Sequence, residues 1–439
     1  MATIDPPLRV GAVSAVAPGR GVRSRLSFYI LRGAEALALV AFLSFCVLWV
    51  QWQASASGVT KLSGDFVSFW TAGLLALHGH AAAAYHRLPH FALQLGLHHD
   101  PGWGYLAFFY PPFFLLPCAG LALLNYFPAL CLWLATSCAG YVAALRALRP
   151  HATPEAARAW TLFLGYPAVM INAGFGQNGF VSAALLGGAA IWLDRRPVLA
   201  GICFGCLAYK PQLGIIVPLA LAAARRWRCV LAAAATVAAL AATATAAFGV
   251  DVWPAFLAGT AEARRDWMEP LNPAYLQYWI TVYGAIRLHG GPLVLAYAAQ
   301  AAVSATAAAL LLYALRRRPP TARSGRAEVA AIAACVPFCS PFMLEYDLVI
   351  LAVPMLWLLG EALRDGFRRG EVVALLAAYA APVLFKVALL DKTMKLGVIA
   401  AAALLFAMVL RRLMRPLPAA AAAVAPPAVA QCRPAASRR

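Results

Sequence analysis

Charged residues are scarce in this sequence, and acidic ones most of all. Only 12% of the 439 residues are charged, 63% are hydrophobic, and the mean hydropathy is +0.74. One globular core could not hide that much apolar surface, so a soluble protein is excluded and lipid must solvate most of the chain. The net charge of +19 would suggest nucleic-acid binding in a soluble protein. Here the arginines form short clusters between apolar runs, so we expect no nucleic-acid partner and interpret the clusters as topology signals.

Several common patterns are absent as well. The N-terminal region has no short apolar segment with a small-residue cleavage site, so we expect the first span to stay uncleaved as an anchor. The ten cysteines lie mostly in apolar runs and show no disulfide framework. We expect Cys203 and Cys206, a C-x-x-C pair in an apolar stretch, to pack as small hydrophobic residues. No repeat of roughly 20 to 50 residues is present, which disfavours a solenoid.

Long apolar runs are abundant, and they predict an all-α polytopic membrane protein with about ten to twelve transmembrane helices. The predicted full spans are Ala34–Trp52, Pro128–Leu145, Ala159–Ala173, Gly179–Leu193, Val230–Val250, Pro292–Leu315, Val329–Phe342, Leu348–Leu363, Val372–Leu389 and Met394–Leu410. The stretch Val198–Ala224 is interrupted by Lys210-Pro211, so we predict a pair of half-helices there.

The basic clusters predict the topology, because they should all share the cytoplasmic side. The clusters are Arg20–Arg32, Arg146–Arg158, Arg195–Arg196, Arg225–Arg228, Arg316–Arg326, Arg364–Arg369 and Arg411–Arg415. They share one side only if Phe108–Leu124, which contains three prolines, is re-entrant or interfacial rather than spanning.

This topology divides the chain into three parts. A cytoplasmic N-terminal tail (1–33) precedes a transmembrane domain (34–415), and a disordered cytoplasmic tail (416–439) follows. Residues 53–127 form a large first outer loop with interfacial or re-entrant helices, and residues 251–291 form a middle outer loop.

A lone carboxylate follows the first span. Asp65 precedes the aromatic-rich stretch Phe66–Leu77, for which we predict a short helix. In low-dielectric surroundings such a carboxylate can have a raised pKa and act as a general base. The alternative is that Asp65 only caps the helix.

Histidines in the same loop raise the question of a metal site. Six of the eight lie there: His78, His80, His86, His90, His98 and His99. His86 and His90 have helical i, i+4 spacing, but Pro89 between them disfavours that helix, and no acidic or cysteine partner has suitable spacing. We predict a solvated loop near the headgroups and no metal.

Two other places combine polar side chains with apolar sequence. Gly174–Gly179 is a glycine-rich bend that holds Gln177 and Asn178, where backbone N–H groups could approach a ligand. Lys210 is one of only five lysines and lies deep in its hairpin, which makes it a candidate partner for a lipid phosphate. Snorkelling of Lys210 to an interface is the alternative.

Charged residues also occur near the outer ends of later segments. Glu345–Asp347, with Tyr346 at its centre, places two carboxylates at the outer end of a predicted span, on the side of the membrane expected for Asp65. Arg264 and Arg265 in the middle loop are natural phosphate or diphosphate binders, and charge pairing at the surface is the alternative.

Five short motifs stand in order between Asp65 and Pro354. They are Gly64-Asp65-Phe66 with Gly79 and Tyr85 following, Phe109-Tyr110-Pro111-Pro112, Gly176-Gln177-Asn178, Ala200-Gly201 through Lys210-Pro211, and Ser340-Pro341 with Tyr346. No single motif is specific. Together, on this topology, they resemble the polyprenyl-phosphate-dependent glycosyltransferases of family 87, which have the GT-C fold.

The resemblance implies a GT-C-like bundle and a mannosyltransferase-like enzyme of the plasma (inner) membrane. Such an enzyme takes a hexose from a polyprenyl-phosphate sugar on the outer leaflet and gives it to a hydroxyl of a glycan or glycolipid. Asp65 matches the family's catalytic carboxylate, which would deprotonate the acceptor while the anomeric carbon is inverted. No cofactor or metal is implied.

The same resemblance makes several residues candidates for substrate binding: Tyr110, Gln177, Asn178, Lys210, Arg264, Arg265, Glu345, Tyr346 and Asp347. One departure from the family is that Glu345 precedes Tyr346 where some members have histidine, which leaves open the residue that meets the phosphate. A transporter or lipid flippase should show internal repeats and charges spread through several spans, and neither is clear here. A non-catalytic scaffold would leave the outer polar motifs unexplained.

Overall fold

The computed structural model describes residues 32–47, 51, 64–98, 104–150, 156–318, 324–388 and 394–414. These residues form helices joined by short turns, and the described part of the chain contains no strand, only one antiparallel bridge between Trp279 and Leu344. The all-α prediction is confirmed. The predicted tails lie outside the described residues, apart from residues 32 and 33.

A helix over residues 32–47 comes first. The first outer loop and the next segments contain α2 (Phe66–Leu77), η2 (Ala81–Tyr85), α3 (Arg87–His98), η3 (Pro112–Phe114), α4 (Leu115–Ala122), α5 (Tyr126–Leu148), η4 (Ala156–Leu164), α6 (Pro167–Phe175), α7 (Gly179–Trp192), α8 (Pro197–Cys206), η5 (Leu207–Tyr209), α9 (Pro211–Gly214) and α10 (Val217–Ala223). The rest of the chain forms α11 (Trp227–Phe248), α12 (Val252–Ala263), the π-helical turn η6 (Arg264–Met268), α13 (Pro273–Leu276), α14 (Val282–Leu288), α15 (Leu293–Arg317), α16 (Gly325–Cys335), η8 (Val336–Phe338), η9 (Glu345–Leu351), α17 (Ala352–Asp365), α18 (Glu371–Ala388) and α19 (Met394–Met414).

Five helices among the described residues are long and apolar enough to cross a membrane. They are Tyr126–Leu148, Trp227–Phe248, Leu293–Arg317, Glu345–Asp365 and Lys395–Met414. Shorter apolar helices of 10–17 residues lie before and between them. The chain is therefore a polytopic membrane protein, while the total of about ten to twelve crossings stays a prediction.

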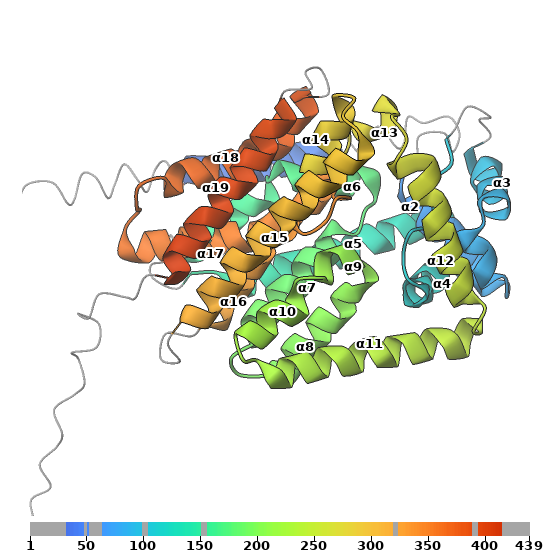
Figure 1. Ribbon diagram of the computed structural model, residues 1–439, viewed down its shortest axis with the longest axis horizontal. Helices are drawn as coiled ribbons and strands as arrows, with labels where there is room; N and C mark the ends of the chain where they lie inside the picture. Colours follow the sequence, from blue (N-terminus) through green and yellow to red (C-terminus); the bar gives the residue numbers. More distant parts are fainter. Residues whose placement is uncertain are drawn as a thin grey trace, which may run out of the picture.

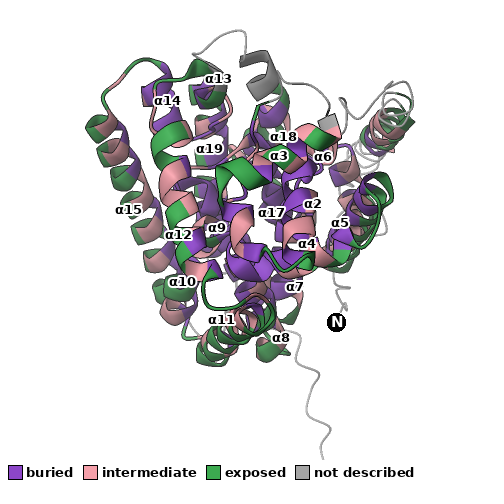
Figure 2. Cartoon of the chain, turned by 90° about the vertical axis from the view of Figure 1, so that its right-hand side faces the viewer, coloured by how far each residue is buried: buried purple, intermediate pink, exposed green. Residues whose placement is uncertain are grey.

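The bundle has a buried centre and an apolar exterior. Figure 2 shows α7 and α17 largely buried, whereas α11 and α15 lie at the periphery with exposed faces. Leu231 on α11 is 70% exposed, and Val294 on α15 is 80% exposed. Water disfavours such continuous apolar faces, so they are the surfaces that lipid covers.

The stretch from α8 to α10 is broken where the sequence predicts a break. Lys210 has a non-helical backbone (φ −119°, ψ 82°) and separates η5 from α9. Pro211 at the start of α9 has no N–H to continue the preceding helix, which is the physical reason for the break. The predicted pair of half-helices is confirmed, with a further interruption between α9 and α10.

The proline-rich stretch before α5 is short and folds back. η3 has three residues and α4 has eight, a rise of about 18 Å, well short of the bilayer's hydrocarbon core of roughly 30 Å. α4 packs closely on α2, because a Cβ added at Gly73 would lie 2.1 Å from the carbonyl oxygen of Cys118. This geometry agrees with the predicted re-entrant or interfacial segment. In Figure 1, α2, α3, α4 and α12 gather together at the right.

The described residues of several basic clusters lie together at the other end of the bundle. Arg226, at the start of α11, contacts Asp194 at 2.7 Å and Glu328 at 2.8 Å. Arg326 donates a hydrogen bond to the carbonyl of Ala147 at 3.3 Å. These contacts link four of the predicted cytoplasmic clusters through space, and Figure 1 shows α11 running from this end toward α12. The compartment that this end faces stays a prediction.

Candidate active site

Four segments that are far apart in the sequence meet at one end of the bundle. They contribute Asp65 before α2, Gln177 and Asn178 between α6 and α7, Lys210 at the break before α9, and Tyr346 with Asp347 in η9. α7 packs tightly on η9, because a Cβ added at Gly179 would lie 2.8 Å from the carbonyl oxygen of Tyr346. The structure thus brings together most of the residues that the sequence nominated.

Asp65 is the residue before α2, but its side chain does not cap that helix. No side-chain cap hydrogen bond forms at the start of α2. The Oδ2 atom of Asp65 instead accepts a hydrogen bond from Nε2 of Gln177 at 2.8 Å, and the Asp65 N–H donates to the Phe175 carbonyl at 3.2 Å. The carboxylate is surrounded by protein while the residue keeps some accessible surface. The capping alternative therefore loses its main support.

The surroundings of Asp65 favour a carboxyl that holds its proton more tightly than usual. Burial raises the pKa of the Asp65 carboxyl above its ordinary value, and the charge of Asp347 adds to the rise. The hydrogen bond from Gln177 and the charge of Lys210 lower the pKa and so oppose it. A recessed carboxylate of this kind is chemically suited to accept a proton from a hydroxyl.

The bend between α6 and α7 lies beside Asp65. Gly176 has a left-handed backbone (φ +65°), which a glycine adopts without strain, and it ends α6. Asn178 is fully buried, and its carbonyl accepts a hydrogen bond from the Tyr209 hydroxyl at 2.9 Å. The Tyr209 hydroxyl also lies 2.6 Å from Oγ of Ser182. Tyr209 and Ser182 were not among the nominated residues, because nothing local marks them.

Aromatic residues pack next to this bend. The Tyr110 hydroxyl donates to Oε1 of Gln177 at 3.4 Å, and the Tyr110 carbonyl accepts from the Tyr85 hydroxyl at 2.9 Å. The Tyr110 ring stacks 6.2 Å from that of Tyr209, which stacks 5.0 Å from Phe114. Tyr110 is therefore held from three sides beside Gln177.

Lys210 is paired with a carboxylate. Its Nζ atom lies 2.6 Å from Oδ1 of Asp347, both side chains are buried, and the ammonium lies 4.9 Å from the centre of the Tyr346 ring. Lys210 does not snorkel to an interface, because only 2% of it is exposed. The structure gives its charge an internal partner, so a role toward a phosphate would require sharing or displacing Asp347.

Another buried carboxylate, Glu345, lies near two residues that the sequence analysis did not nominate, Tyr278 and Lys395. Glu345 is 1% exposed and acts electrostatically on Tyr278 and Lys395. Burial raises the pKa of the Tyr278 hydroxyl, and the negative charges of Glu345 and Asp65 raise it further. Nζ of Lys395 donates to the carbonyls of Leu276 at 2.6 Å and Trp279 at 3.2 Å. Tyr278 has no local sequence signal, but a lysine opening an apolar span could have drawn attention to Lys395.

The two nominated arginines of the middle loop lie apart from this cluster. Arg264 and Arg265 are exposed on η6, and Nε of Arg264 lies 3.4 Å from Oε1 of Glu269. Surface charge pairing accounts for Arg264. Their role as phosphate binders stays a prediction.

The histidines differ from expectation in one respect. His90 is fully buried rather than solvated, and its ring lies 2.8 Å from the Thr71 hydroxyl and 3.2 Å from that of Tyr105. Burial lowers the pKa of His90 to about 4, so the ring is neutral. α3 begins at Arg87, after His86, and includes Pro89 in its first turn, where a missing N–H breaks no helical hydrogen bond. Within the described ranges no group of three His, Cys, Asp or Glu side chains could hold a metal.

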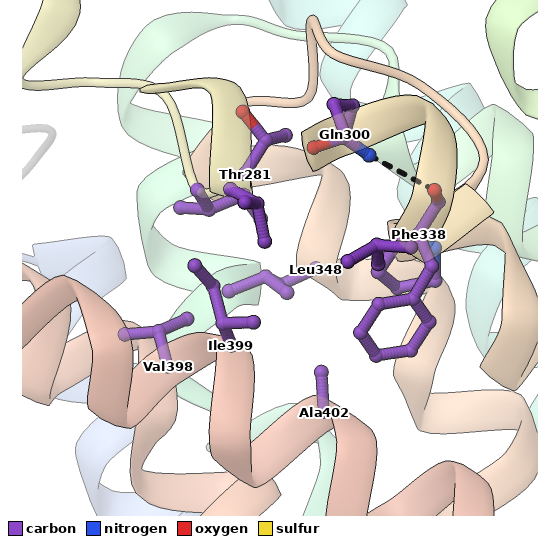
Figure 3. A pocket seen from close by; sticks show the side chains of 11 residues that line it. Thr281, Gln300, Phe338, Leu348, Val398, Ile399 and Ala402 are labelled. Carbon is purple, nitrogen blue, oxygen red and sulfur yellow. Dashed lines mark hydrogen bonds between the residues drawn. The ribbon is translucent and has the colours of Figure 1, made fainter. Parts of the chain in front are cut away.

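A small cavity elsewhere is not the site. Figure 3 shows it between α14, α15, η8 and α19, with Gln300 donating to the Phe338 carbonyl at 3.0 Å. Its volume of about 10 Å³ is room for a single water molecule at most. The carboxylate cluster around Asp65, and not this cavity, holds the groups that can move a proton.

The fold is a helical membrane bundle, and a cluster of carboxylates, amides and phenols lies at one end of it. The protein is therefore an integral membrane protein with a polar site at one end of its bundle. The family model of glycosyltransferase family 87 matches residues 108–341, which is more than half of the chain. The chain therefore belongs to glycosyltransferase family 87 and is a membrane glycosyltransferase, as its motifs predicted. Gln177, Asn178 and Lys210 lie inside the matched stretch, and Asp65 precedes it. No curated protein and no solved structure matches the chain.

Proposed function

We propose that this enzyme transfers a hexose, with mannose as the first candidate, from a polyprenyl-phosphate sugar to a hydroxyl group of a glycan or glycolipid. The transfer takes place at the outer face of the plasma (inner) membrane, with the Asp65 end of the bundle facing outward and both termini in the cytoplasm. The reaction inverts the anomeric carbon and uses neither a cofactor nor a metal.

Asp65 is the general base of the proposed reaction. Its carboxylate takes the proton of the acceptor hydroxyl as that oxygen forms a bond to the anomeric carbon. The bond from the anomeric carbon to the phosphate oxygen breaks at the same time, and the polyprenyl phosphate leaves with the electron pair. The observation that carries the proposal is that Asp65 leads a helix without capping it and faces Gln177 across a chain separation of 112 residues.

The other residues of the cluster bind the substrates. Lys210 and Asp347 form a charged pair next to Asp65, and the aromatic ring of Tyr346 covers the ammonium. Tyr110, Asn178 and the Glu345 carboxylate complete a polar lining for a sugar and a phosphate. Arg264 and Arg265 lie farther out and would meet an anionic substrate only as it approaches.

Replacement of Asp65 by Asn tests the proposal. Asn keeps the size of the side chain but cannot accept a proton, so we expect Asp65→Asn to lower the transfer rate by a factor of roughly 100 to 10,000. The assay follows radiolabelled hexose from polyprenyl-phosphate mannose in membranes that contain the enzyme. Insertion and folding should be unchanged.

Asp251 provides a matched control, because it also precedes a helix, α12, without a side-chain cap and is exposed. Asp251→Asn should transfer at the parent rate. Transfer by Asp65→Asn within a few-fold of Asp251→Asn would overturn the general-base mechanism.

A further inference from the structure

The orientation of the Gln177 amide is settled by its neighbours. The backbone N–H of Asn178 lies 3.1 Å from Oε1 of Gln177, and a backbone N–H can only donate. Oε1 must therefore be the acceptor end, and the Tyr110 hydroxyl donates to the same atom. The donor end, Nε2, then faces Oδ2 of Asp65 at 2.8 Å.

The backbone around Gln177 also holds Asp65. The Asp65 N–H donates to the Phe175 carbonyl at 3.2 Å, and the Gln177 N–H donates to the Asn172 carbonyl at 3.0 Å. The Trp133 indole N–H donates to the Gly176 carbonyl at 3.0 Å. One rigid bend thus fixes both the main chain and one carboxylate oxygen of Asp65.

We infer that Gln177 is a positioning residue, which holds Oδ2 of Asp65 so that Oδ1 faces the acceptor hydroxyl. This replaces the substrate-binding role that the sequence suggested for Gln177. Its side chain is buried, with 4% of the residue exposed, and both ends of its amide are engaged by protein groups. The inference rests on the proposed function, in which Asp65 is the base.

The energetic consequence follows from which form of Asp65 the amide prefers. An N–H donor stabilises the charged carboxylate more than the neutral acid, so loss of this donor makes Asp65 harder to ionise. Lys210 and Asp347 also act on the Asp65 carboxyl, with opposite signs. The hydroxyls of Tyr110, Tyr278 and Tyr346 are the other titratable groups that sense its charge. Of these groups, Tyr110 contacts Gln177 directly, and its hydroxyl loses an acceptor in Gln177→Leu.

The test compares Gln177→Glu and Gln177→Leu with Gln300→Glu in purified full-length enzyme. Gln300 is a buried glutamine with the same pattern, because its Oε1 accepts from the Tyr283 N–H and its Nε2 donates to the Phe338 carbonyl. It lies at the cavity of Figure 3 and outside the Asp65 cluster. Folding is checked by size-exclusion profile and helical circular dichroism, and kcat/KM is measured against pH with polyprenyl-phosphate mannose as donor.

We expect the acidic limb of kcat/KM to move to higher pH by about one unit in both Gln177 variants. The value of kcat at neutral pH should fall about tenfold, while the KM for the donor changes less than threefold. Gln300→Glu should leave the acidic limb of kcat/KM where it lies in the parent enzyme, whatever the effect of the substitution on stability. If Gln177→Leu does not fold, Gln177→Met takes its place, because it also removes the N–H donor and adds no charge, whereas the carboxylate of Gln177→Glu would itself raise the pKa of Asp65.

Two results would overturn the inference. An unmoved acidic limb in the folded, uncharged Gln177 variant shows that the amide does not act through the carboxylate. A rise in donor KM without a change in kcat or in the limb returns Gln177 to substrate binding. Failure of the proposed function itself is recognised separately, because Asp65→Asn would then remain active, whereas failure of the positioning role leaves Asp65→Asn inactive.

Discussion

The buried pair of Lys210 and Asp347 is the strongest charge interaction near the site. Their charged atoms lie 2.6 Å apart with almost no exposure to solvent. Removal of one partner leaves an uncompensated charge in a low-dielectric region, which typically costs about 3 to 5 kcal/mol.

We therefore predict that Lys210→Ala lowers both the stability of the folded protein and its use of the polyprenyl-phosphate sugar donor. The apparent melting temperature of the purified variant in detergent measures the first effect, and the donor dependence of the rate measures the second. In the double variant Lys210→Met with Asp347→Leu, stability should return because no charge stays buried, while donor use should stay impaired. Recovery of full donor use by the double variant would rule out a phosphate role for Lys210.

The pKa of Asp65 gives a prediction for the pH profile of the parent enzyme. A general base works only when ionised, and burial raises the pKa of this carboxyl above the ordinary value of about 3.9. Activity should therefore be lost as the pH falls through a value above that of an ordinary aspartate. A rate profile from pH 4 to 8 shows the midpoint, and activity that persists down to about pH 4 would contradict a raised pKa.

At the scale of elements, α8 and α11 meet through two glycines. A Cβ added at Gly201 would lie 2.6 Å from the Cys229 carbonyl oxygen, and one added at Gly205 would lie 2.5 Å from the Cβ of Thr236. The four-residue spacing places both glycines on one face of α8, the arrangement that lets membrane helices approach closely. Since most of the α11 surface is exposed, this contact is its main attachment to the bundle.

We predict that Gly201→Ala and Gly205→Ala each destabilise the protein by about 1 to 3 kcal/mol, because the helices must move apart. Gly214→Ala is the control, since a Cβ there meets nothing within 4 Å. It should be neutral or slightly stabilising, as alanine favours helix over glycine. Thermal unfolding in detergent separates the cases, and equal melting temperatures for all three variants would show that the close contact is absent in the folded protein.

At the scale of the whole molecule, the Asp65 cluster and the basic clusters occupy different ends of the bundle. The positive-inside rule then predicts that Arg225–Arg228 faces the cytoplasm and that Asp65, His98 and Glu262 face outward. Leu88→Cys on α3 and Arg228→Cys in the first turn of α11 are exposed reporter positions. In a background without the exposed native Cys131, an impermeant thiol reagent should label Leu88→Cys in intact cells and Arg228→Cys only after permeabilisation. The reverse pattern would invert the topology.

The sequence by itself determined the features that depend on neighbouring residues. Apolar runs indicated a membrane protein, because lipid is the only solvent that suits them. The helix over Phe66–Leu77 and the break at Lys210 were also predictable, because aromatic-rich helical sequence and Lys210-Pro211 act locally on the backbone. The motifs were sufficient to indicate the family, since they stand in order along the chain and can be recognised without knowledge of the fold.

The tertiary structure decided which distant residues contact one another. The sequence could nominate Asp65 as base or cap, but only folding places Gln177, 112 residues away, against its carboxylate. Lys210 could be recognised as a buried cation, yet its partner Asp347 is 137 residues away, and no local pattern encodes that pairing. His90 is buried for the same reason, because the packing of α3 on α2 and not its loop composition sets its exposure. Local sequence fixes backbone preferences over a few residues, whereas charge pairing and burial depend on contacts that form only when distant segments pack together.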